Sequence, residues 1–256
     1  MTGMLASVTD ATEAEVALQA GADLIDCKDP RSGALGALPV SMIDAIRRQV
    51  AGRRPISATV GDLPTEATEL VPAVQRIAAT GVDFVKLGLF RTSGIDPLLD
   101  ALSPLAAEHR LIAVLFADRS PRLGVVTELA AAGFSGVMLD TANKTSGRLL
   151  DVMPTDQLAT FVALAREHRL LCGLAGRLRV EDVPPLLALR PDYLGFRSAL
   201  CQHDRNSELS AAACAQVRAS VGHTSVGQTG GSVLDDVRRA AGRRFASRPL
   251  ASGACR

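Results

Sequence analysis

The chain has 256 residues, a mass of 26.8 kDa and a formal net charge of +1. A nearly neutral chain has no general attraction for nucleic acid or for an anionic membrane surface, so we expect a small-molecule partner. It has no basic leader, no apolar run of the roughly 18 residues that a membrane span needs, and no CxxC pair among its five cysteines. These features predict a reduced, cytoplasmic protein, and they leave homo-oligomer formation open.

Short apolar runs alternate with segments of helical spacing along the first half of the chain. Thr9 and Asp10 can cap a first helix, and Gly21 and Gly81 each follow a helical segment, as helix-ending glycines do. The strands are expected at residues 4–8, 24–28, 55–59 and 84–87. The helices are expected at residues 11–20, 40–50 and 70–79.

The same alternation continues through the second half of the chain. The helices are expected at residues 97–108, 123–132, 155–167, 180–189 and 210–219. The strands are expected at residues 111–116, 137–140, 171–174 and 193–196. From about Gly222 the composition changes to glycine, serine and arginine, which is typical of an appended, flexible and solvated tail.

Strict strand-helix alternation with short loops predicts a parallel sheet, and eight such units at this length favour a closed (β/α)8 TIM barrel. We assign this single catalytic domain to residues 1–220 and the tail to residues 221–256. An open, doubly wound sheet is the alternative. It is disfavoured because no strand is followed by a GxGxxG or GxxxxGK[ST] phosphate loop.

Lysine is scarce in this arginine-rich chain, with only Lys28, Lys86 and Lys144 among 28 basic residues. A guanidinium does not lose its proton in proteins, so a retained lysine is a candidate for chemistry that needs a neutral amine. The three lysines are equally spaced and lie at or just beyond the second, fourth and sixth strands. Because barrel active sites lie at the C-terminal ends of the strands, we expect these side chains to converge at the mouth.

Carboxylates accompany the lysines. Alternation along the second strand puts Asp26 on the inward face with Lys28 and turns Ile25 and Cys27 toward the helices, while Asp140 ends the sixth strand. A partly desolvated amine beside other cations loses its proton readily and can form a Schiff base with a carbonyl, while carboxylates move protons. The alternative interpretation is a set of buried Asp–Lys pairs that only stabilise the barrel.

The loops after the seventh and eighth strands, LAGRL and GFRSA, are candidates for binding a substrate phosphate. Gly176 and Gly195 allow the backbone to approach closely, Arg177 and Arg197 offer bidentate forks, and Ser198 lies beside them. Glycine and arginine also occur in ordinary loops of this kind, so a purely structural role stays open. No metal site and no cofactor are predicted, because no histidine or cysteine cluster has ligand spacing.

Six ordered motifs lie between residues 4 and 218: IDCKDP with the following GALGA, SATVGD (57–62), VKLGL (85–89), LDTANK (139–144), LAGRL (174–178) and DRNS (204–207). Together they resemble the (5-formylfuran-3-yl)methyl phosphate synthase family, also called 4-(hydroxymethyl)-2-furancarboxaldehyde-phosphate synthase. The tail lies outside this resemblance.

The resemblance implies a barrel that condenses two molecules of glyceraldehyde 3-phosphate into a phosphorylated furan aldehyde, a precursor of methanofuran-type cofactors. It implies that Lys28 is the Schiff-base nucleophile, assisted by Lys86, Lys144, Asp26 and Asp140. The chain departs from the family pattern at Arg177, where a small polar residue is expected, and in the loop at 118–120.

Two other functions fit parts of the pattern. A Schiff-base aldolase of the deoxyribose-phosphate type would use the same lysine chemistry without releasing inorganic phosphate. A non-catalytic barrel that binds a phosphorylated metabolite would use the lysines only as charge partners. The DxKxxD arrangement of some decarboxylase barrels fits Asp26 and Lys28 but fails at Arg31.

Overall fold

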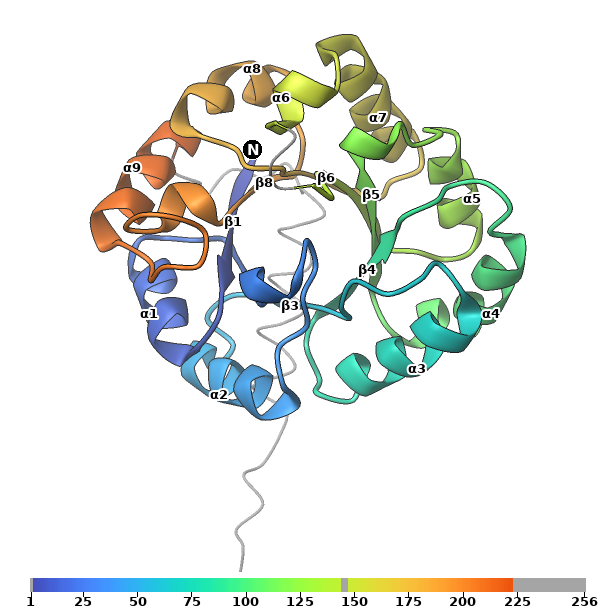
Figure 1. Cartoon of the computed structure of the whole chain (residues 1–256), viewed down its shortest axis with the longest axis horizontal. Helices are drawn as coiled ribbons and strands as arrows, with labels where there is room; N and C mark the ends of the chain where they lie inside the picture. Colours follow the sequence, from blue (N-terminus) through green and yellow to red (C-terminus); the bar gives the residue numbers. More distant parts are fainter. Residues whose placement is uncertain (1, 144–146, 223–256) are drawn as a thin grey trace, which may run out of the picture.

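The computed structural model describes residues 2–143 and 147–222, which form a closed barrel of parallel strands in sequence order, with β8 pairing β1. Figure 1 looks along the barrel and shows the ring of helices around it. The strands are β1 (Gly3–Val8), β2 (Leu24–Cys27), β3 (Ile56–Thr59), β4 (Phe84–Leu89), β5 (Leu111–Phe116), β6 (Gly136–Asp140), β7 (Leu171–Leu174) and β8 (Tyr193–Phe196). The predicted (β/α)8 fold is therefore confirmed, and the open sheet is wrong.

Helices connect successive strands and cover the outside of the barrel. The α-helices are α1 (Ala11–Gln19), α2 (Val40–Val50), α3 (Ala67–Ala78), α4 (Asp96–Glu108), α5 (Val125–Ala131), α6 (Leu149–Val152), α7 (Thr155–Glu167), α8 (Val183–Ala188) and α9 (Ala211–Val221). Short 3-10 turns are η1 (Pro30–Ser32), η2 (Ala117–Arg119), η3 (Val180–Asp182) and η4 (Ser198–Leu200). The side chain of Asp10 accepts from the Glu13 amide at the start of α1, so the predicted cap is confirmed.

Most element boundaries agree with the sequence-based prediction to within a few residues, and α2, β5, α7, β7 and β8 agree at both ends. The helix expected at 180–189 is instead η3 followed by α8. Pro184 and Pro185 follow in the first turn of α8, where their missing N–H groups are tolerated, but they cannot continue a helix that started at Val180. The short helix α6 and the 3-10 turns were not predicted, because they have no apolar periodicity of their own.

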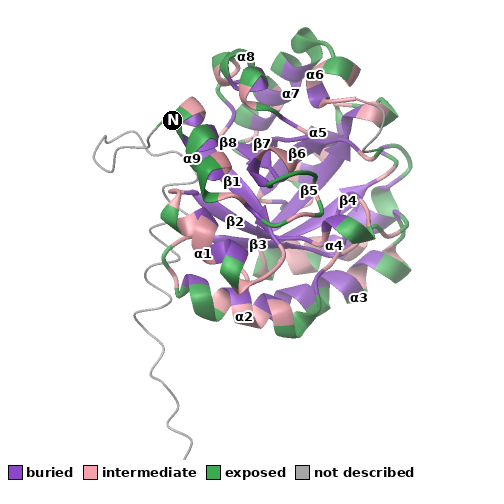
Figure 2. Cartoon of the chain, turned by 60° about the vertical axis from the view of Figure 1, so that its left-hand side comes forward, coloured by how far each residue is buried: buried purple, intermediate pink, exposed green. Residues whose placement is uncertain are grey.

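The strands alternate between two cores. Outward residues such as Ile25 and Cys27 belong to the large cluster between strands and helices, as predicted, whereas Leu24, Phe84 and Tyr193 belong to a smaller cluster inside the barrel. Figure 2 shows the strands buried beneath partly exposed helices. The apolar inner cluster fills the barrel interior, and the polar residues of the strands lie at the mouth, where they form the site.

The loop after β2 folds back over the barrel interior, which Figure 1 shows as a blue segment inside the ring. Its residues Ala34 and Leu35 are buried in the inner cluster. Asp62, beyond β3, holds them there by accepting from the amides of Ala34 at 2.7 Å and Leu35 at 2.6 Å. Gly33 has φ of 107°, and an added Cβ would lie 2.1 Å from Asp62 Oδ2, so this turn requires glycine.

The tail prediction concerns residues of which all but Val221 and Gly222 lie outside the described part of the chain, and Val221 ends α9. Among the described helices, none is both long and apolar enough to cross a membrane.

Candidate active site

A polar cluster forms the floor of the barrel mouth, and we call its four residues, Ser7, Asp26, Ser57 and Lys86, the floor cluster. The strand register puts Ser7 and Ser57 directly beside Asp26 on the two neighbouring strands. Ser57 Oγ donates to Asp26 Oδ1 at 2.6 Å, Ser7 Oγ donates to Oδ2 at 3.0 Å, and Lys86 Nζ donates to Oδ1 at 3.0 Å. All four residues are buried.

Burial alone would raise the pKa of Asp26, but the charges of Lys86 and Lys28 and the hydrogen bond from Ser57 outweigh it and leave this pKa below its ordinary value. The pKa of Lys86 is also lowered, because burial disfavours its charged form and the charge of Lys28 adds to that effect, against the attraction of Asp26. The floor cluster thus holds a carboxylate and an amine that pair with one another, each with its pKa below the ordinary value.

Lys28 lies one layer above the floor cluster, at the carboxyl end of β2. Its ammonium forms an ion pair with Asp140 Oδ2 at 3.7 Å, a longer contact than the one between Lys86 and Asp26. Asp140 ends β6 and accepts from the amide of Thr141 at 2.7 Å. The predicted convergence of Lys28, Asp26, Lys86 and Asp140 is therefore confirmed as geometry, while Lys144 lies outside the described residues.

A cavity opens at this end of the barrel. The charged residues that line it are Asp26, Lys28, Asp140, Arg177, Arg197 and Arg205. Lys86 does not line it and is 1% exposed, so of the two described lysines only Lys28 faces the space that a substrate would enter.

The predicted phosphate-binding loops line one side of this cavity, with Gly176, Arg177, Gly195 and Ser198 all on its wall. Gly176 has φ of 113° and Arg177 follows with φ of 53°, a left-handed conformation that costs a non-glycine residue energy. Strained backbone of this kind clusters at ligand-binding sites. The Arg177 side chain forms no hydrogen bond or ion pair with another described residue and is partly exposed.

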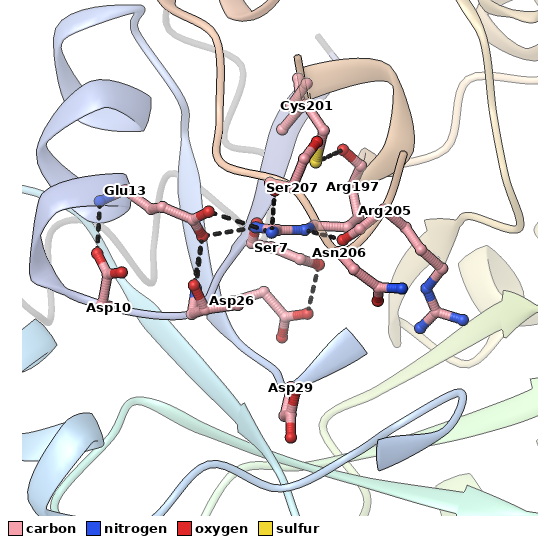
Figure 3. Close-up of polar contacts among 12 residues, drawn as sticks. Ser7, Asp10, Glu13, Asp26, Asp29, Arg197, Cys201, Arg205, Asn206 and Ser207 are labelled. Carbon is pink, nitrogen blue, oxygen red and sulfur yellow. Dashed lines mark hydrogen bonds and ion pairs between the residues drawn. The ribbon is translucent and has the colours of Figure 1, made fainter. Parts of the chain in front are cut away.

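The structure gives the Arg197 side chain a different role from the bidentate fork expected from the sequence. Its guanidinium donates to both carboxylate oxygens of Glu13, at 2.5 and 3.1 Å, and to the carbonyls of Ser7, Arg205 and Ser207. These contacts use all five N–H donors of an arginine. The side chain therefore has no donor left for a phosphate and instead joins α1 to the loop after β8 (Figure 3).

Arg205 is a cavity residue that the sequence analysis did not single out, although it lies within the DRNS motif. It comes from the loop between η4 and α9, which the bridge between Cys201 and Leu209 closes. In Figure 3 its guanidinium points away from the pair of Glu13 and Arg197. The sequence signal that could have identified Arg205 was its place in the DRNS motif. Its position beside the loop after β2 could not be predicted, because it depends on the fold.

Comparisons with known proteins identify the family of this chain. A family model described as 4-HFC-P synthase matches residues 4–218. A Methylorubrum extorquens protein, to which (5-formylfuran-3-yl)methyl phosphate synthase activity is provisionally assigned by name, is 47% identical over 83% of this chain and 89% of its own length. A Methanopyrus kandleri protein named (5-formylfuran-3-yl)methyl phosphate synthase is 37% identical over 79% of this chain and 91% of its own length.

Among solved structures, phosphoribosyl anthranilate isomerase from Thermus thermophilus superimposes with a TM-score of 0.60 over 86% of this chain and 98% of its own. Its sequence identity of 16% supports the shared barrel fold alone. The match over nearly the whole described barrel, together with relatives above 30% identity, is decisive: this chain belongs to the 4-HFC-P synthase family.

Proposed function

We propose that the protein is a Schiff-base-forming carbon-oxygen lyase that condenses two molecules of glyceraldehyde 3-phosphate into (5-formylfuran-3-yl)methyl phosphate. Elemental balance requires the loss of one phosphate and of water. The product carries one retained phosphate and would serve the synthesis of methanofuran-type cofactors. The names of the relatives support the product, and the site chemistry supports the route.

The observation that carries this proposal is the placement of Lys28. It is the described lysine that lines the cavity, at the carboxyl end of a barrel strand, with a carboxylate 3.7 Å from its ammonium. Its neutral amine would attack the carbonyl of one triose phosphate, expel that oxygen as water and leave an imine. Loss of a proton from the adjacent carbon gives an enamine, which would attack the aldehyde of the second molecule.

Nearby carboxylates and amines would move the protons. Asp140 is the carboxylate nearest to Lys28 and would accept the proton that the ammonium must release. The other members of the floor cluster keep Asp26 ionised. The positive charge of Lys86 would still balance the charge of Asp26 when Lys28 becomes neutral. Lys144, which lies outside the described residues, would assist as the family resemblance implies.

A retained phosphate would bind along the β7 and β8 loops. Gly176, Arg177, Gly195 and Ser198 line the cavity there, and the side chains of Arg177 and Ser198 would supply hydrogen-bond donors to the phosphate. Elimination of the other phosphate, ring closure and dehydration would complete the furan, and hydrolysis of the imine would release the product aldehyde and regenerate the amine of Lys28.

Borohydride reduction in the presence of glyceraldehyde 3-phosphate tests the nucleophile. We expect a stable adduct on the peptide that contains Lys28, detected by peptide mass mapping, together with furan absorbance and phosphate release from untreated enzyme. An adduct on Lys86 instead would refute the assignment of the nucleophile. Reversible cleavage of a sugar phosphate without phosphate release would favour the aldolase alternative.

A further inference from the structure

We propose that Arg205 binds a substrate phosphate, and that the buried pair of Glu13 and Arg197 is a positioning device that holds Arg205 over the cavity. This inference rests on the proposed function only in taking a phosphorylated triose as the ligand.

The first argument is the unused hydrogen-bonding capacity of Arg205. Its Nη2 donates to the carbonyl of Gly33 at 2.8 Å, and its guanidinium has no other hydrogen-bond acceptor among the described residues. Arg197, only eight positions earlier, has every donor occupied. A guanidinium fork matches a phosphate monoester, which accepts two parallel N–H bonds from one arginine. The free donors of Arg205 therefore suit that ligand.

The second argument is charge. Lys86 faces Asp26, Lys28 faces Asp140, and Arg197 faces Glu13. Arg177 and Arg205 have no carboxylate at ion-pair distance among the described residues, so the cavity has an excess of positive charge. Partial burial lowers the pKa of Arg205, and the charges of Arg197 and Arg177 add to this, against Asp140 and Asp62. An anion bound between Arg177 and Arg205 would relieve that repulsion.

The third argument is the way in which the backbone of Arg205 is held. Arg197 Nε donates to the carbonyl of Arg205 at 2.8 Å, and Arg197 Nη2 donates to that of Ser207 at 2.8 Å. Glu13 is buried and also accepts from the amide of Thr9 at 2.7 Å, so the pair of Glu13 and Arg197 is anchored at the start of α1. A loop whose backbone is fixed in this way needs less ordering when its arginine binds a ligand.

Inorganic phosphate is the probe for a direct test, with the full chain and isothermal titration. We expect Arg205→Met to weaken phosphate binding by about tenfold or more, the scale of a lost charge-assisted hydrogen bond, and Arg205→Lys to weaken it less. Arg31→Met is the matched control, because Arg31 is exposed in the neighbouring η1 turn and does not line the cavity. Unchanged affinity in Arg205→Met, or no phosphate binding by the unaltered protein, would overturn the proposal.

Glu13→Gln tests the positioning role. We expect it to weaken phosphate binding and to raise KM for glyceraldehyde 3-phosphate more than it lowers kcat. The control is Asp23→Asn, which breaks a comparable buried ion pair, Arg218 with Asp23 at 2.6 Å, at the start of β2 and away from the cavity. If both variants lose stability and neither loses phosphate affinity, the pair of Glu13 and Arg197 is only structural and the positioning role is wrong.

The two proposals fail separately. Furan production that is normal in Arg205→Met, with unchanged phosphate affinity, removes the role of Arg205 and leaves the proposed reaction intact. Phosphate binding that depends on Arg205 in a protein that makes no furan removes the reaction and leaves the binding role.

Discussion

The floor cluster and the mouth above it contain the same kinds of charged group, but those of the floor cluster have close hydrogen-bond and ion-pair partners and those at the mouth have few in the part of the chain that the structure describes. In the floor cluster, Asp26 accepts three hydrogen bonds and the Lys86 ammonium lies 3.0 Å from it. At the mouth, Lys28 lies 3.7 Å from Asp140, and Arg177 and Arg205 have no ion-pair partner among the described residues. The difference indicates that the hydrogen bonds of the floor cluster stabilise the charges of Asp26 and Lys86. At the mouth, the amine of Lys28 and the guanidinium donors of Arg177 and Arg205 can instead contact a ligand.

This contrast separates two consequences of burying charge. A fully hydrogen-bonded buried pair fixes the protonation of its members and makes the loss of either partner costly. A longer ion pair at a cavity wall contributes less stabilisation, so less is lost when the partner of the amine moves or when a substrate takes the place of that partner. Variants in the floor cluster should therefore act mainly on stability, and variants at the mouth mainly on turnover.

The largest expected effect is at Lys28. Lys28→Met should lower kcat by about 10⁴-fold or more, because loss of a nucleophile removes a step that no neighbour replaces. Lys28→Arg keeps the positive charge and should lose as much, because a guanidinium does not form a Schiff base under these conditions. Both rates can be measured by furan absorbance. Substantial turnover by the arginine variant would mean that charge alone is needed.

The next effect is on stability. Asp26→Asn leaves the Lys86 ammonium buried without its counter-charge and should lower the free energy of unfolding by about 3–5 kcal/mol. The pKa of Lys86 should fall further below its unfolded value, so the unfolded state binds more protons and stability rises with pH in the alkaline range. The deficit relative to the unaltered protein should therefore shrink from neutral to alkaline pH.

Urea denaturation at both pH values measures this deficit. Lys28→Met is the comparison at the mouth and should cost less free energy of unfolding than Asp26→Asn. If the mouth variant were the less stable of the two, the division between floor cluster and mouth would be wrong.

The smallest expected effect is at Ser57. Ser57→Ala removes one donor to Asp26 and should cost about 1.5 kcal/mol, since Lys86 still donates to the same oxygen. A carboxylate with a lowered pKa contributes stability above its unfolded pKa and loses it as pH falls through the folded one. Without Ser57 the pKa of Asp26 should rise toward its ordinary value. The deficit should thus be present at neutral pH and shrink in acid, and a deficit independent of pH would contradict the hydrogen bond to the ionised form.

Two arginines after β8 illustrate the limit of sequence reasoning. Arg197 was expected to bind phosphate because it follows a barrel strand, and Arg205 was given no role. In the structure every donor of Arg197 is occupied: two bonds go to Glu13, which lies 184 positions earlier in the chain, and three go to backbone carbonyls. Since the two side chains have identical chemistry, only the nearby acceptors distinguish them. For Arg197 these acceptors come from β1, from α1 and from the loop before α9, and no local sequence pattern brings the first two to Arg197.

The sequence by itself determined the alternation of strands and helices, the inward face of Asp26 and Lys28, and the family, because these follow from local periodicity and from motifs that are continuous in the chain. It also pointed to Lys144, whose role stays a prediction. Only the tertiary structure decided that Lys28 faces the cavity while Lys86 lies beneath it. The same holds for the free guanidinium of Arg205 and the occupied one of Arg197. Exposure and hydrogen-bond partners are properties of the closed barrel, since they depend on residues far apart in the chain that meet only when β8 pairs with β1.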